Sequence, residues 1–265
     1  MNVQLLAYTP DPDKVVATAA KLCYSDFDIN SLMENLTEEK TAKFIDMLVS
    51  IGHESPIEHV SFTFGIEGIS RCTSHQLVRH RIASYSQKSQ RYVSEAQFDY
   101  ITPPLIESDP DLNAMYFEYM MKTQQFYQKL QDALIEKNTE LLIADGVLES
   151  IAHNKAVKLA NEDARFVLPN ACETKIVVTM NARSLFNFFK HRCCERSQWE
   201  IRAVANEMLR LCKGVAPQIF KYVGPSCVML GRCPEGKMSC GKANEMKEKY
   251  RTKEINTNES ELQDK

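Results

Sequence analysis

The chain has 265 residues, a hydrophobic content of 44% and a formal net charge of −3. This length can bury one sizeable core, and the acidic balance argues against a general nucleic-acid-binding protein, which would usually be basic. No apolar stretch of the sequence reaches the roughly 18 to 20 residues that a membrane-spanning helix needs. The opening residues, MNVQLLAYTPDPDK, lack the basic start and long apolar run of a signal peptide, so we expect a cytoplasmic protein.

Helical and alternating patterns predict the elements of the first part of the chain. They are a strand over 2–9, a helix over 12–23, a helix from the Thr37 cap to Gly52, a strand over 60–66 and a helix over 70–79. A basic segment follows, which we expect to be an extended polar loop.

The second part predicts longer helices. The elements are a short strand over 98–102, a helix over 111–144, a helix over 147–161, a strand over 173–180, and helices over 181–192 and 198–213. Aromatic residues recur at three- and four-residue steps along the longest helix, which indicates packing in a core or a subunit interface. Helices and strands without regular alternation favour an α+β fold, with a mixed sheet flanked by long helices. Residues 223–241 form a cysteine- and glycine-rich extension, and the charged residues 242–265 are expected to be disordered.

The basic segment has no acidic residue between Gly68 and Ser94. Its cations are Arg71, Arg79, Arg81, Lys88 and Arg91. The ordinary explanation is a solvated surface, but like charges without an acid repel, and a bound anion relieves that repulsion. We therefore favour an anion-binding site. Neither GxGxxG nor GxxxxGK[ST] occurs, so side chains must supply the anion contacts.

The sequence RHR at 79–81, followed by seven residues and Ser89, resembles the signature of the flavin-dependent thymidylate synthase family. Further segments agree with this resemblance in chain order. They are GHESPIEHVSFTF at 52–64, EDARFVLP at 162–169, and NARSLFNFF with the downstream arginine and QWEIR at 181–202. The resemblance covers roughly residues 1–222, which it implies to be one catalytic domain with the fold of this family.

The resemblance implies a methyltransferase that makes dTMP from dUMP. FAD would be the cofactor, methylenetetrahydrofolate the one-carbon donor and NADPH the reductant, with no protein nucleophile. It also implies a homotetramer with active sites at subunit interfaces, and no nucleic-acid or membrane partner.

The resemblance also implies roles for individual residues. Those expected to contact FAD are His53, Ser55, Arg79, His80, Arg81, Gln87, Asn181, Ala182, Arg183 and Asn187. Those expected to hold dUMP are Gln76, Arg79, Gln87, Lys88, Ser89, Arg91, Arg165 and Arg192. Arg192 is implied to be catalytic, polarising the pyrimidine. These types fit the task, because guanidinium groups pair with phosphate oxygens in bidentate fashion. Some members carry histidine where this chain has Arg196, which leaves a flavin contact at that position open.

Several of these residues also have structural explanations. Arg165 follows two acidic residues and could form a helix-end ion pair, and Arg192 sits where cations favour the helix dipole. Ser89 has no adjacent base, so we expect it to bind rather than attack. Two other functions remain open: a pyrimidine methylase with a cysteine nucleophile, and a nucleic-acid-binding module that uses the basic segment 71–91.

The chain has nine cysteines at irregular spacing. Cys227, Cys233 and Cys240 could form a structural zinc site with a fourth ligand such as Cys194 or Cys172. Their spacings exceed that of a CxxC knuckle, so we favour ordinary thiols and predict no metal.

Overall fold

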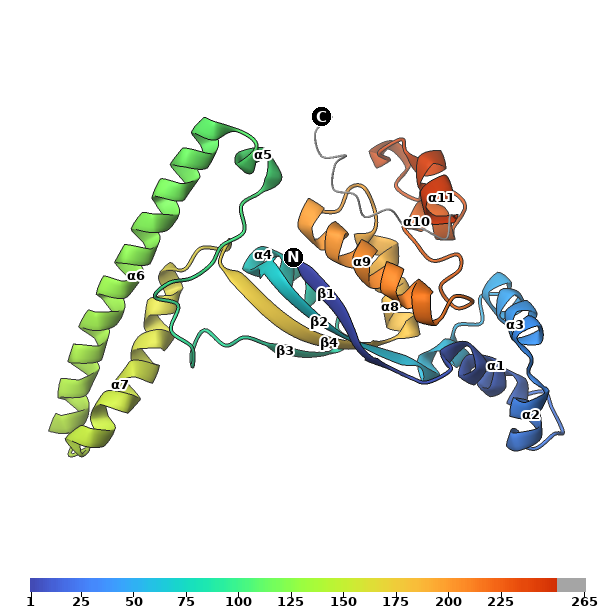
Figure 1. Ribbon diagram of the computed structural model, residues 1–265, viewed down its shortest axis with the longest axis horizontal. Coiled ribbons are helices and arrows are strands. Elements are labelled where there is room, and N and C mark those ends of the chain that lie inside the picture. The colour runs from blue at the N-terminus through green and yellow to red at the C-terminus, as the bar shows by residue number, and fades with distance from the viewer. Residues whose placement is uncertain (252–265) are drawn as a thin grey trace. The chain divides into compact units, whose positions relative to one another are not determined.

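The computed structural model describes residues 1–251 (Figure 1). The chain divides into two compact units. Unit 1 comprises Met1–Glu67, His75–Ser86 and the chain from Ile176 onward; unit 2 comprises Gly68–Ser74 and Gln87–Lys175. Both units therefore draw on the predicted catalytic domain.

A four-stranded sheet runs in the order β1 (Asn2–Tyr8), β2 (Ser61–Ser70), β4 (Glu173–Asn181) and β3 (Ser84–Gln87). The first two strands pair antiparallel, with a bulge between Leu5 and Ala7. Strands β2 and β4 also run antiparallel, because the end of each strand is hydrogen-bonded beside the start of the other. Ala182 N–H donates to Val60 O, and Arg71 N–H donates to Cys172 O. The α+β class is confirmed, but the predicted mixed sheet is wrong because the sheet is antiparallel.

Strand β3 corrects a second expectation. The basic segment was predicted to be a loop throughout, but Ser84–Gln87 forms a strand beside β4. Polar residues can form such a strand because backbone groups make the ladder, while only every second side chain needs to be buried. Here Tyr85 is half-buried and Ser84 and Ser86 are exposed.

The core of unit 1 lies between the sheet and α8 (Ala182–Arg192) and α9 (Trp199–Val215), which cover one face of it (Figure 1). Phe62, Phe64 and Ile66 alternate along β2 and are fully buried. The ring of Phe220 meets Phe62 edge-on, with centroids 5.4 Å apart. Phe186 and Phe189 of α8 meet the same Phe220 ring edge-on, so this packing attaches α8 to the sheet. Each such buried side chain contributes roughly 1.5 to 3 kcal/mol.

The helices near the N-terminus follow the predicted pattern, with one addition. α1 (Pro12–Leu22) and α3 (Glu38–Ser50) match the expected ranges, and the Thr37 hydroxyl accepts the Lys40 N–H at 3.3 Å. α2 (Ile29–Asn35), which was not predicted, is capped by Asp28. The short helices η1 (Ser55–His59) and α4 (Arg71–Leu77) bracket β2.

Unit 2 is built on a hairpin of two long helices, α6 (Pro110–Ala144) and α7 (Glu149–Ala164) (Figure 1). Small side chains let the helices approach closely, because one alanine in each turn of α7 is fully buried. These are Ala152, Ala156, Ala160 and Ala164. Of the aromatic stripe on α6, Tyr127 is fully buried, whereas Tyr119 and Phe126 are exposed.

The segment that joins α4 to the hairpin is less regular than predicted. Before α5 (Pro104–Glu107), residues 98–102 form only a single bridge, between Tyr100 and Cys172. The prediction of a short strand is therefore wrong. Side chains of α6 instead donate hydrogen bonds to backbone carbonyls of this segment: Gln124 donates to Phe98 O, and Tyr116 donates to Ile101 O.

The C-terminal extension continues beyond 241 to the last described residue, 251. It contains α10 (Ser226–Met229), η3 (Gly236–Met238) and α11 (Ala243–Arg251). The predicted disorder over 242–265 is wrong for α11, because Met246 and Tyr250 lie one helical turn apart and are both buried. The remainder of that range, 252–265, lies outside the described residues.

Among residues 1–251, no helix combines the length and the apolarity needed to cross a bilayer.

Candidate functional site

Arg192 and His80 form the central contact of the predicted site in unit 1. Arg192 ends α8, and its Nε donates a hydrogen bond to His80 Nε2 at 3.2 Å. Phe188 also packs against the imidazole, with the two rings edge-on and their centroids 5.0 Å apart. Helix α8 supplies both groups, since Phe188 lies one turn before Arg192.

The electrostatics of this pair require a neutral imidazole. Burial, with added repulsion from Arg192 and His191, lowers the pKa of His80 to about 4. At neutral pH, Nε2 therefore keeps the lone pair that accepts the arginine proton. Burial and the charge of Arg79 lower the pKa of Arg192, but a guanidinium remains protonated at any physiological pH. The cluster thus holds two nearby guanidinium charges against one neutral acceptor.

Tyr85 shapes the turn that carries the RHR sequence. Its hydroxyl lies 2.9 Å from both Leu77 O and His80 O, so it ties the end of α4 to the turn. Burial raises the pKa of Tyr85 to about 12, which keeps this donor protonated. Arg79 and Arg81 remain exposed on the turn, and within the described residues neither forms a salt bridge. They are therefore available to an anion such as the diphosphate of FAD.

The N-terminal end of α8 carries further residues predicted to meet FAD. The Asn181 side chain caps the helix by accepting the Ser184 N–H at 2.8 Å. Arg183 forms an exposed double ion pair with Glu54 at 3.3 Å and with Glu58. Asn187, one turn on from Arg183, is exposed, whereas Ala182 is fully buried, so its methyl group is not open to a ligand.

The loop before β2 places two further candidates. His53 and Ser55 are exposed, on either side of Glu54 at the start of η1. Gly52, with a φ of 73°, makes the turn that precedes them, a conformation that a side chain would strain. Glu54 and Glu58, which sequence reasoning did not assign, belong to the same element and hold Arg183 beside it.

Unit 2 contains the residues predicted to hold the nucleotide phosphate, and acids accompany its cations. Arg91 Nε donates to Glu162 Oε1 at 2.6 Å. Lys88 Nζ lies 2.9 Å from a carboxylate oxygen of Glu95, which is only 3% exposed. Gln87 donates to the hydroxyls of Ser74 and Thr174, at 2.9 and 3.1 Å. Each of these predicted contacts already has a protein partner.

Ser89 and Arg165 complete this group. The Ser89 hydroxyl accepts the Arg91 N–H at 3.2 Å, an arrangement that shapes a turn and does not activate a nucleophile. Arg165 caps the C-terminal end of α7. The pKa of Arg71 is lowered chiefly by its own burial and further by the positive charge of Arg165. Thus Arg71, from the basic segment, and Arg165 lie within electrostatic range of each other.

The predicted site residues fall into two groups. Unit 1 brings Arg79, His80 and Arg192 together, and α8 and η1 carry the other expected FAD contacts. Gln76, on α4, also belongs to unit 1. Unit 2 holds Gln87, Lys88, Ser89, Arg91 and Arg165. The sequence did not indicate a role for Tyr85 or for the acidic partners of the cations, such as Glu95 and Glu162. The only feature that could have pointed to them is that they lie within or beside the motifs of the family.

Comparison with known proteins assigns the chain to a family. The family model described as "Thymidylate synthase complementing protein" matches residues 4–218. A protein of Clostridium tetani named flavin-dependent thymidylate synthase is 58% identical over 94% of this chain and 97% of its own length. Proteins with the same name from Geobacter sulfurreducens and Nitratidesulfovibrio vulgaris are 50% and 47% identical, over 96% and 91% of this chain and 100% and 94% of theirs. The chain belongs to the thymidylate synthase complementing protein family, together with these flavin-dependent thymidylate synthases.

Proposed function

We propose that this protein is a flavin-dependent thymidylate synthase, a methyltransferase with the family's α+β fold that converts dUMP to dTMP. Methylenetetrahydrofolate supplies the carbon unit and NADPH the reducing equivalents, through FAD. The observation that carries the proposal is the Arg192–His80 contact beside Arg79, in a chain whose similarity to the named enzymes spans nearly its full length.

Arg192 has the properties that pyrimidine activation requires. Its guanidinium is half-buried, and its hydrogen-bond partner in unit 1 is a neutral imidazole, so its charge is not cancelled there. Set against a uracil carbonyl, such a charge stabilises the negative charge that develops when the ring is activated at C5. His80 fixes the plane of the guanidinium through Nε, which leaves its terminal nitrogens for the substrate.

The bound flavin would supply hydride transfer, so the protein needs no nucleophile of its own. The pKa values of three buried cysteines support a mechanism without a protein nucleophile. Burial raises the pKa of Cys172 to about 11 and that of Cys193 to about 12, and it also raises that of Cys212. These thiols are poor nucleophiles at neutral pH, which argues against the cysteine-dependent alternative.

The remaining residues would bind and orient the ligands. Arg79, His80 and Arg81, with His53, Ser55 and the N-terminal turn of α8, would hold FAD. Gln76, Lys88, Ser89, Arg91 and Arg165 would hold dUMP together with Arg79 and Arg192, and Gln87 would serve both ligands. The exposed pairs Arg91–Glu162 and Arg183–Glu58 would exchange their carboxylates for ligand anions, because exposed ion pairs are only weakly stabilising.

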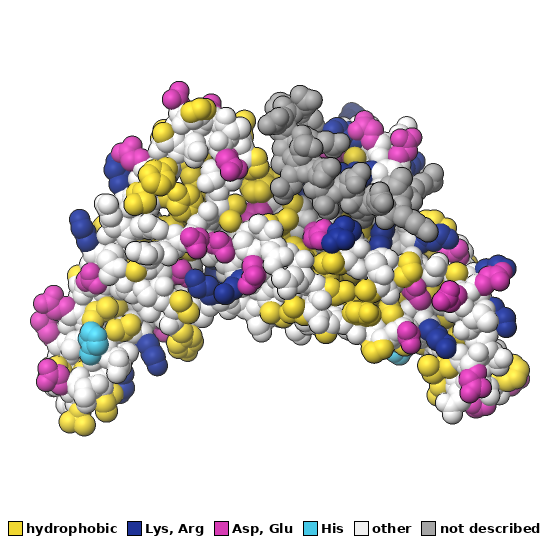
Figure 2. Space-filling view, viewed as in Figure 1, with side chains coloured by type: hydrophobic (Ala, Val, Ile, Leu, Met, Phe, Trp, Pro, Cys, Tyr) yellow, Lys and Arg dark blue, Asp and Glu magenta, His cyan; other side chains and the backbone are white. Residues whose placement is uncertain are grey.

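We further propose a homotetramer with active sites at subunit interfaces. Large apolar side chains lie exposed along α6, where Met115, Phe117, Tyr119 and Phe126 are each more than half exposed. Figure 2 shows hydrophobic side chains along the hairpin of α6 and α7. Such a surface is typical of a subunit interface. We place the protein in the cytoplasm, in keeping with nine cysteines that form no disulfide in the described residues, where all of them lie.

The test is spectroscopic and enzymatic. Purified protein should be yellow, its flavin absorbance should shift when dUMP is added, and it should form dTMP from dUMP, methylenetetrahydrofolate and NADPH. A colourless protein that FAD cannot reconstitute would refute the proposal. Mass measurement by light scattering should give four chains, and a monomer would refute the proposed assembly alone.

A further inference from the structure

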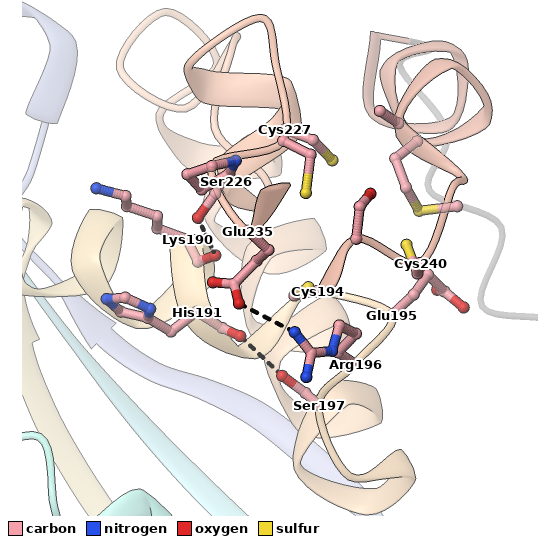
Figure 3. A pocket seen from close by; sticks show the side chains of 15 residues that line it. Lys190, His191, Cys194, Glu195, Arg196, Ser197, Ser226, Cys227, Glu235 and Cys240 are labelled. Atoms are coloured by element: carbon pink, nitrogen blue, oxygen red, sulfur yellow. Dashed lines mark hydrogen bonds and ion pairs between the residues drawn. The ribbon is translucent and has the colours of Figure 1, made fainter. Parts of the chain in front are cut away.

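Four of the nine cysteines line one pocket of unit 1, in a region that the proposed reaction does not use. They are Cys194, Cys227, Cys233 and Cys240. The pocket has a volume of about 240 Å³ and lies between the turn that joins α8 to α9 and the C-terminal extension. Figure 3 shows Cys194, Cys227 and Cys240 around the same hollow, contributed by segments far apart in the sequence.

Several contacts anchor the segments that carry these thiols. The Ser226 hydroxyl donates to Lys190 O at 3.2 Å, which ties α10 to α8. Arg196 and Glu235 form an ion pair at 3.0 Å across the pocket (Figure 3). Beyond the cysteines, the Tyr250 hydroxyl lies 2.6 Å from Asn206 Oδ1 and 3.2 Å from Cys193 O, which docks α11. The extension is therefore held on both sides of Cys233 and Cys240.

The sequence left open which distant cysteine could join the three of the extension, and the structure decides between the two candidates. Cys172 belongs to unit 2, where it is fully buried in an apolar cluster with Phe98 and Met120. Cys194 lies in the same pocket as the other three. The set is therefore Cys194, Cys227, Cys233 and Cys240.

A divalent cation suits this group of thiols. Cys194, Cys233 and Cys240 all lie close enough to Cys227 to interact with it electrostatically. A divalent cation would stabilise all four groups as thiolates at once. Four thiolates around such an ion leave a net charge of about −2, which Lys190, in the lining of the same pocket, would partly offset. Two other charged side chains of the lining are already paired, Arg196 with Glu235 and Glu195 with Arg202.

We propose that Cys194, Cys227, Cys233 and Cys240 bind one structural Zn²⁺ as a tetrahedral four-thiolate site. Four sulfur ligands select zinc or an iron–sulfur cluster, and a site closed by four protein ligands is structural. On binding, four thiols lose their protons and four zinc–sulfur bonds form, without any change of oxidation state.

Binding must draw the sulfurs inward. In the described residues, no group of three His, Cys, Asp or Glu side chains is already arranged to hold a metal ion. The chain can make this adjustment, because Cys240 is exposed and Gly231, Gly236 and Gly241 adopt positive φ in the turns around Cys233 and Cys240. Zinc would then lock the extension against the turn after Arg192. This inference does not depend on the proposed function.

The first experiment measures metal content in protein purified without chelator from medium supplemented with zinc. Elemental analysis should give one zinc per chain. Cobalt added to metal-free protein should produce thiolate-to-cobalt charge-transfer bands and the strong visible bands of a tetrahedral site. Absence of stoichiometric zinc together with absence of these bands would overturn the proposal. Stoichiometric iron with acid-labile sulfide would overturn the choice of zinc.

Matched variants assign the ligands. Cys240→Ser changes an exposed side chain, so the fold should persist while zinc affinity falls at least tenfold. Cys23→Ser, at the exposed end of α1, should retain one zinc per chain. Zinc retained at full affinity in both Cys240→Ser and Cys194→Ser would refute the site. A disulfide between any two of the four cysteines in freshly purified protein would refute it as well.

Discussion

Two arginines predicted to meet the same nucleotide lie in unlike surroundings. Arg192, at the end of α8, is half-buried and donates to a neutral histidine. Arg91, in unit 2, is exposed and pairs with the carboxylate of Glu162. A desolvated cation with a neutral partner presents its full charge to a ligand, whereas an exposed cation paired with an acid must exchange one anion for another. We therefore expect Arg192 to govern the chemistry and Arg91 to govern affinity.

The largest effect should follow Arg192→Ala. Formation of dTMP should fall by about a hundredfold to a thousandfold, the loss typical of removing one donor that stabilises developing charge. Bound flavin should remain, because Arg192 is not among the residues expected to contact FAD. Single-turnover kinetics with dUMP and flavin absorbance measure the two properties separately.

The matched control for this variant is Arg210→Ala. Arg210 lies on α9 in the same unit, and its ion pair with Glu207, three residues away, is local to the helix. This control should keep its turnover. If Arg192→Ala turned over normally, the pyrimidine would have to be activated by another group, and the contrast between the two arginines would be lost.

Sequence predicted the helices of this site well, because their ends carry local signals. The helix predicted to begin at Asn181 does begin there, with Asn181 as the cap of α8, and the predicted Thr37 cap is confirmed for α3. The partners of the cations could not be read in this way. Glu162 is 71 residues from Arg91, and His80 is 112 residues from Arg192, so only the fold brings them together. α11 was missed because its burial depends on two residues in an otherwise charged segment.

The next largest effect concerns the acceptor of Arg192. Since folding lowers the pKa of His80 from 6.5 to about 4, the unfolded chain binds more protons than the folded one in that interval. The free energy of unfolding should therefore rise with pH from about 4 to 6.5, by about 1 to 2 kcal/mol once the partial exposure of the ring is allowed for. Denaturant unfolding at a series of pH values measures this slope.

His80→Asn should remove that part of the slope, while His153→Asn, at an exposed position on α7, should keep it. An identical pH dependence in wild type and His80→Asn would show that the imidazole is not held neutral by burial and Arg192. The claim that Arg192 donates to a neutral histidine would then be wrong.

Arg91→Ala should act on affinity. We expect dUMP binding to weaken by about tenfold, as for the loss of one charge-assisted contact, with FAD binding unchanged. Titration of the flavin absorbance with dUMP gives the dissociation constant. Lys122→Ala, which breaks an exposed ion pair with Glu118 on α6, serves as the control and should leave it unaltered. Equal dUMP affinity in wild type and Arg91→Ala would remove Arg91 from the phosphate site.

The smallest effect, and the sharpest test of the contrast, comes from Glu162→Gln. If Arg91 must leave Glu162 to meet the phosphate, neutralising that carboxylate should tighten dUMP binding by about two- to fivefold, since an exposed ion pair contributes little. In the Arg91→Ala background the same substitution should have no effect, because the two residues act as one pair. Glu118→Gln controls for the loss of one surface charge in unit 2. Weaker dUMP binding in Glu162→Gln would mean that the carboxylate orients Arg91 toward the nucleotide instead of competing with it, and Arg91 would then resemble Arg192, which a neighbouring side chain also holds in place.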